Sequence, residues 1–149
     1  MSDFENIVPA ANKEGMLKNE SLLKQEPDLF PREFQNDMIK WRHYFHQNPE
    51  TAYKEVNTSK KIIELLKSFN VDNIETGFGK TGVVATIENG PGKSIGLRAD
   101  MDALPIQEEN TKAEHCSKKK GTMHACGHDG HTTMLLGAAK YLSETRNFR

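Results

Sequence analysis

Apolar side chains at helical spacing predict two helices in the first half of the chain. Between residues 33 and 46 the apolar positions recur at steps of three and four, which places Phe34, Met38, Trp41 and Phe45 on one face of an amphipathic helix. Pro31 suits the first residue of this helix, and Asn48-Pro49 suits its end. A second helix is predicted over residues 55–69, ending at Asn70, with an apolar face made of Val56, Ile62, Ile63, Leu65, Leu66 and Phe69.

The first of these helices also carries two histidines, His43 and His46, three positions apart. This spacing can bring two rings together on one face of a helix. Histidines on the flank of a helix are more often solvated than ligating, however. We therefore interpret both as surface residues and leave them out of the primary site.

After Asn70 the pattern becomes that of a sheet. Glycines at 77, 79 and 82 mark a turn, and residues 83–87 form a β-branched run typical of a strand. Asn89-Gly90-Pro91-Gly92 is a strong turn signal, so residues 94–98 are predicted to form the partner strand. Residues 107–121 read as a polar connection, and a further helix is predicted after His131. The sequence thus predicts an α/β fold.

Composition and charge bound the classes of function. The 149 residues carry a net charge of -1 with both signs intermixed, which gives no indication of a nucleic-acid or membrane surface. Residues 1–30 read as a polar extension, with a short helix over 16–25, and residues 31–149 as one domain. No segment resembles a signal peptide or reaches membrane-spanning length, so we predict a cytoplasmic protein with reduced cysteines.

A dense cluster of metal-ligating residue types lies just before the last predicted helix. The octapeptide His124-Ala125-Cys126-Gly127-His128-Asp129-Gly130-His131 holds half of the six histidines and one of the two cysteines. Thiolate and imidazole are preferred ligands of zinc and similar ions. Cys126 and His128 would point about 200° apart on a regular helix, so sharing an ion requires a non-helical backbone, which Gly127 and Gly130 favour. Two ligands do not complete a zinc site.

Two aspartates follow the predicted strand over residues 94–98. Asp100 and Asp102 lie two residues apart, so in an extended segment their carboxylates point to the same side. Open α/β sheets bind ligands at the carboxyl ends of their strands. A solvated turn or a helix cap is the alternative, but a metal cluster about twenty residues later favours a functional interpretation.

Three motifs together resemble one family of enzymes. Residues 41–50 (WRHYFHQNPE), 96–106 (GLRADMDALPI) and 123–132 (MHACGHDGHT) are similar, in order, to the amino-terminal motifs of metal-dependent amidohydrolases. That family includes hippurate hydrolase, N-acyl-amino-acid amidohydrolases and indoleacetyl-amino-acid hydrolases, and is related to metallo-aminoacylases and zinc carboxypeptidases. The match runs from about residue 35 to 146.

The resemblance implies a fold, a cofactor and a reaction. The fold would be part of a zinc-peptidase-like (phosphorylase/hydrolase-like) three-layer sheet with flanking helices, truncated before the family's inserted dimerisation domain and carboxyl-terminal half. Two divalent ions, zinc or manganese, would serve the hydrolysis of N-acyl amino acids. Cys126 and His128 match metal ligands, Asp102 and Asp100 match acidic catalytic positions beside the metals, and Asp129 and His131 would orient ligands.

The remaining family ligands and the general-base glutamate match no residue here, so we expect weak metal binding and little activity from residues 1–149 alone. Three alternatives stay open. The chain is part of an amidohydrolase, a non-catalytic module that kept the fold, or a small domain with a structural metal completed by Cys116 or His124.

Overall fold

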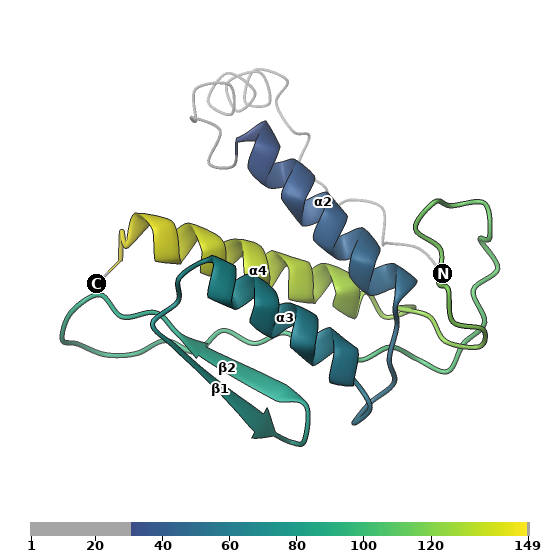
Figure 1. Ribbon diagram of the computed structural model, residues 1–149, viewed down its shortest axis with the longest axis horizontal. Helices are drawn as coiled ribbons and strands as arrows, with labels where there is room; N and C mark the ends of the chain where they lie inside the picture. The colour runs from purple at the N-terminus through teal and green to yellow at the C-terminus, as the bar shows by residue number, and fades with distance from the viewer. Residues whose placement is uncertain (1–30, 149) are drawn as a thin grey trace, which may run out of the picture. The chain divides into compact units, whose positions relative to one another are not determined.

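The computed structural model describes residues 31–148, so the predicted extension over 1–30 and its short helix lie outside the described residues. Gln35–Arg149 forms one compact unit. The described elements are three helices and two strands: α2 (Arg32–Gln47), α3 (Val56–Ser68), β1 (Asn73–Phe78), β2 (Gly82–Thr86) and α4 (His128–Thr145) (Figure 1). None of these helices is both long and apolar enough to cross a lipid bilayer.

α2 and α3 begin and end within one residue of their predicted bounds, whereas α4 begins already at His128 and not after His131 as predicted. Asn70 has a positive φ of 56° directly after α3, the left-handed conformation that commonly ends a helix. The start of α3 is secured by Glu50, a buried carboxylate that accepts hydrogen bonds from the Thr58 amide at 2.8 Å and from Asn57 Nδ2 at 2.8 Å. The amide groups in the first turn of a helix have no partner within it, so Glu50 supplies one from outside.

The sheet is a two-stranded antiparallel hairpin of β1 and β2, in the register Asn73↔Thr86 to Phe78↔Gly82. The mixed α/β fold class is confirmed, but the predicted strand pairing is wrong. Residues 82–86 pair with the segment before them, because Gly77, Gly79 and Lys80 take positive φ values and close a tight turn there.

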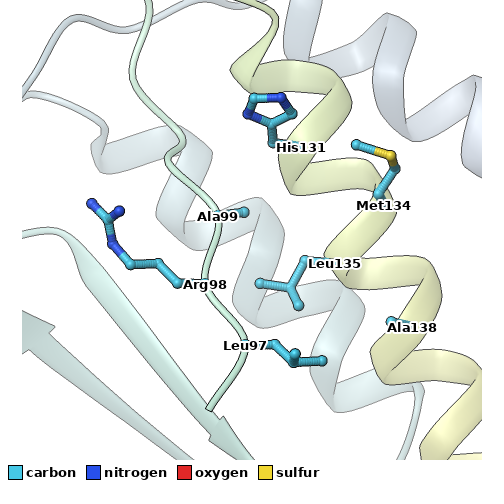
Figure 2. A pocket seen from close by; sticks show the side chains of 7 residues that line it. All are labelled: Leu97, Arg98, Ala99, His131, Met134, Leu135 and Ala138. Atoms are coloured by element: carbon cyan, nitrogen blue, oxygen red, sulfur yellow. The ribbon is translucent and has the colours of Figure 1, made fainter.

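The predicted partner strand over residues 94–98 is an extended segment outside the sheet. Within the described part of the chain, the backbone groups of residues 93–99 make no hydrogen bond. Ile95 is 87% exposed and Leu97 is 60% exposed. Together with α4, this segment lines an open, mostly apolar hollow of about 470 Å³ whose walls are Leu97, Arg98, Ala99, His131, Met134, Leu135 and Ala138 (Figure 2).

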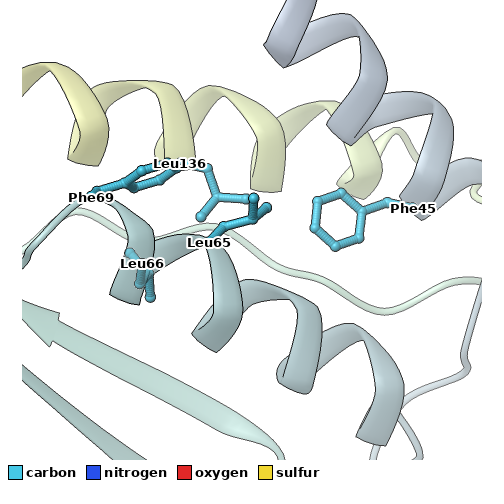
Figure 3. Close-up of a cluster of buried hydrophobic side chains, with 5 residues drawn as sticks. All are labelled: Phe45, Leu65, Leu66, Phe69 and Leu136. Atoms are coloured by element: carbon cyan, nitrogen blue, oxygen red, sulfur yellow. The ribbon is translucent and has the colours of Figure 1, made fainter.

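The core lies where α3 meets α4 and β2. Its buried members come from α2, from α3 and the residue after it, and from α4: Phe45, Leu65, Leu66, Phe69 and Leu136 (Figure 3). Trp41 packs against Phe69 with ring centroids 5.3 Å apart. In α2 and α3, Phe45, Leu65, Leu66 and Phe69 are among the apolar positions that repeat at helical spacing, so in these two helices the amphipathic pattern determines which face is buried.

Candidate metal centre

The predicted ligands sit at the junction of a loop and a helix. Gly127 has a φ of 82° and precedes α4, whose first residue is His128. The amides of Gly130 and His131 both donate to the Gly127 carbonyl, at 3.0 and 3.1 Å. The prediction of non-helical backbone is therefore right for Gly127 and wrong for Gly130, which lies in the first turn of α4. Cys126 and His128 are consequently on different kinds of backbone, as a shared ion requires.

The structure brings Asp102 and His128 together. Asp102 Oδ1 lies 2.9 Å from His128 Nδ1, and the Asp102 carbonyl oxygen lies 3.0 Å from the same nitrogen. Oxygen atoms of a carboxylate and a carbonyl accept, so Nδ1 carries the proton and Nε2 is the nitrogen left for a metal. Histidine ligands are commonly oriented in this way by a carboxylate.

Asp100 is placed differently from Asp102. Its carboxylate pairs with Arg98, and its carbonyl oxygen accepts from Thr132 Oγ1 at 3.1 Å. Among the hydrogen bonds of residues 31–148, Asp102 is the one of the two predicted catalytic aspartates whose side chain bonds to a histidine of the cluster. Asp100 instead ties the end of the extended segment to α4.

The cysteines are both free, Cys126 exposed and Cys116 half-buried with its Sγ 3.9 Å from the Thr111 carbonyl. Among residues 31–148 no three His, Cys, Asp or Glu side chains are grouped so that they could hold a metal ion. A structural metal completed by Cys116 or His124 therefore finds no support in the described chain. Cys126 and His128 have the right chemistry for a metal, but they are only part of a ligand set.

A buried polar cluster behind this site was missed by the sequence analysis. His46 is 6% exposed, and its Nδ1 lies 2.8 Å from Asp129 Oδ2 while its Nε2 lies 3.3 Å from Glu108 Oε1. The interpretation of His46 as a solvated residue is wrong, because the end of α2 is covered by the 107–121 connection and the start of α4. His43 is half-buried and stacks on His115, with ring centroids 4.3 Å apart.

Charges in this cluster are set by its hydrogen bonds. Burial alone would raise the pKa of Asp129, but the hydrogen bonds from His46 and the Gly130 amide more than offset it and lower that pKa. The pKa of Glu108 is likewise lowered, against the effect of burial, by the Ser117 amide and His46. Burial lowers the pKa of His124, which favours its neutral form. Both ring nitrogens of His124 are buried and have no hydrogen-bond partner among the described residues.

Asp102 beyond the extended segment, the oriented His128 and the exposed thiol of Cys126 have the chemistry of part of the site of a metal-dependent hydrolase. Residues 96–149 match the model of Peptidase family M20/M25/M40. Among curated proteins, the chain is 46% identical over 127 residues to N-acyl-L-amino acid amidohydrolase of Geobacillus stearothermophilus, covering 85% of this chain and 34% of that protein. It is 51% identical over 117 residues to hippurate hydrolase of Campylobacter jejuni, covering 78% and 30% respectively.

Solved structures agree. The YXEP protein of Bacillus subtilis, described as a dinuclear metal binding peptidase of the M20 family, matches with a TM-score of 0.74 and 41% identity, over 78% of this chain and 33% of that one. The chain thus spans about a third of the length of these relatives. Over residues 96–149 the chain therefore matches the M20/M25/M40 family, and its similarity to these relatives confirms the resemblance that the three motifs indicate.

Proposed function

We propose that this chain supplies part of the metal site of an amidohydrolase that cleaves the amide bond of N-acyl amino acids. The observation that supports it is the 2.9 Å contact of Asp102 with His128, two residues after the exposed Cys126. Relatives named for the hydrolysis of N-acyl-L-amino acids and of hippurate are 46% and 51% identical to this chain over 127 and 117 residues.

Cys126 and His128 would hold the metal, with His128 presenting Nε2 because Asp102 engages Nδ1. A divalent ion bound there, zinc or manganese, supplies Lewis acidity and lowers the pKa of a water molecule. A thiolate ligand favours zinc. Asp102 would keep the His128 ring in one tautomer and orientation throughout the reaction, and raise its basicity as a ligand.

The substrate is proposed to be a small molecule, in a cytoplasmic setting, without nucleic acid or membrane. This rests on a net charge of -1 with interspersed signs and on the names of the relatives. Family members are expected to dimerise through a domain that none of the predicted elements represents.

Cobalt titration of the purified chain tests the metal part of the proposal. We expect weak binding with a thiolate-to-cobalt absorption band that disappears in Cys126→Ser and weakens in His128→Ala. Cys116→Ser is the matched control, since Cys116 lies outside the octapeptide, and its band should match that of the parent chain. A band that survives Cys126→Ser, or no band at all, would contradict the assignment.

Activity is tested on the protein purified from the organism that makes it, and the intact mass of that protein is measured first. Release of amino acid from N-acyl amino acids should be abolished by a chelator, restored by zinc or manganese, and absent in Cys126→Ala. Turnover that ignores the chelator and persists in Cys126→Ala would instead indicate a different chemistry, and a chain that binds metal without turnover would indicate a non-catalytic module.

A further inference from the structure

His46 joins three segments that are far apart in the chain. It stands near the end of α2, contacts Asp129 in the first turn of α4, which is 83 residues later, and contacts Glu108 in the polar connection, which is 62 residues later. Glu108 in turn accepts a hydrogen bond from the Ser117 amide, which joins two parts of the polar connection. A buried histidine between two carboxylates is an expensive arrangement unless all its hydrogen bonds are made.

Asp129 is the residue through which His46 reaches the predicted metal ligands. It is 1% exposed, directly follows His128, and its Oδ2 lies 2.8 Å from His46 and 3.4 Å from Arg42 Nε, both on α2. Its carbonyl oxygen accepts from Thr133 Oγ1 at 2.8 Å. Asp129 therefore fixes the backbone of the first helical turn against α2.

His128 is consequently held from two sides. Asp102 fixes its ring from the end of the extended segment, and the Asp129–His46 contact fixes its backbone from α2. Neither contact uses His128 Nε2 or the Cys126 thiol. A ligand held in this way needs less ordering when it binds an ion, which is the usual role of the groups that support a metal ligand.

We propose that His46 is a positioning residue for the metal ligands, acting through its Nδ1 hydrogen bond to Asp129. The metal role in this proposal rests on the proposed function above. His46 touches neither predicted ligand, and its shorter contact, at 2.8 Å, is the one directed at α4, whereas the contact with Glu108 is 3.3 Å long. The start of α4 should therefore depend on Nδ1 and much less on Nε2.

Two substitutions separate the two ring nitrogens. His46→Asn keeps a donor near the position of Nδ1, and His46→Gln keeps one near the position of Nε2. His43→Gln is the matched control, because His43 lies on the same helix but stacks on His115 and makes no recorded contact with Asp129. Hydrogen exchange at the Gly130 and His131 amides, which bond to Gly127, reports the order at the start of α4 without any metal.

In His46→Gln we expect exchange at these amides to accelerate about tenfold or more, since a buried hydrogen bond is lost. Cobalt affinity should fall roughly tenfold, which is typical when a group behind a metal ligand is removed. His46→Asn and His43→Gln should stay within about threefold of the parent in both measurements. Exchange in α3 serves as the check that each variant is folded.

The proposal is overturned if His46→Gln leaves exchange at the start of α4 unchanged, or if His46→Asn and His46→Gln behave alike. Should His46→Gln not fold, Glu108→Gln weakens the contacts of Glu108 with His46 Nε2 and with the Ser117 amide but leaves the Nδ1 contact with Asp129 in place. Faster exchange at Gly130 and His131 in that variant would equally overturn the proposal. Absence of cobalt binding by the parent chain would overturn the proposed function alone, because the exchange measurement needs no metal.

Discussion

From the packing of the core we predict that Leu136→Ala lowers the free energy of unfolding substantially. Leu136 is 3% exposed and is the buried apolar side chain that α4 contributes to the cluster with Phe45, Leu65, Leu66 and Phe69. The substitution removes about three buried methylene equivalents at ~0.8 kcal/mol each, and incomplete closure of the cavity adds to this loss. We expect the free energy of unfolding to fall by about 3 kcal/mol, and the melting temperature by roughly 10 °C for a domain of this size.

Urea denaturation followed by the fluorescence of Trp41 measures this loss, because Trp41 is the sole tryptophan and packs on Phe69 in the same cluster. Met134→Ala is the matched control: Met134 lies on the same helix, is 58% exposed, and should change the unfolding free energy by less than about 0.5 kcal/mol. A loss below about 1 kcal/mol for Leu136→Ala, or equal losses for both variants, would refute the assignment of the core.

Two further predictions concern charge and exposed apolar surface. The pKa of Glu108 is lowered in the folded chain, so on acidification this carboxylate is protonated in the unfolded chain before it is protonated in the folded one. The free energy of unfolding should therefore decrease as the pH falls below about 4.3. In urea titrations at pH 3 to 7, Glu108→Gln should reduce the slope of this decrease by up to about 1.4 kcal/mol per pH unit. Ile95→Lys should leave the unfolding free energy within about 0.5 kcal/mol of the parent, since Ile95 is 87% exposed. The same substitution should reduce self-association in sedimentation experiments, and unchanged association would show that the open segment is not a contact surface.

The helices were predictable because their signals are local. The three- and four-residue repeat leading to Phe45, the apolar face ending at Phe69 and the stop at Asn70 all depend on neighbours within a few turns. Strand pairing is not local in this sense. The sequence has turn signals on both sides of residues 82–86, one at residues 77–82 and one at 89–92. In the structure residues 82–86 pair with β1 across the first of these turns.

The site divides in the same way. Cys126, His128 and Asp102 could be predicted as site residues because their residue types and motifs carry the chemistry, and the structure adds that Asp102 reaches His128. The burial of His46 could not be predicted, since its partners Glu108 and Asp129 lie 62 and 83 residues later in the chain. A histidine on the flank of a helix gives no sign in the sequence that it is buried. The one available hint was that His46 directly follows the buried Phe45 just before the helix ends.

The open extended segment has a consequence for how the chain can be cut. Proteases bind their substrates as extended strands, and residues 93–99 offer such a strand, with exposed Lys93 and Arg98, without any unfolding. Cleavage after Arg98 would separate Asp102 and the octapeptide from β1 and β2, yet Leu136 would still pack against α3. The two pieces would then be held together by the core and by polar contacts such as that of His46 with Asp129, so the folded state could outlast an intact backbone.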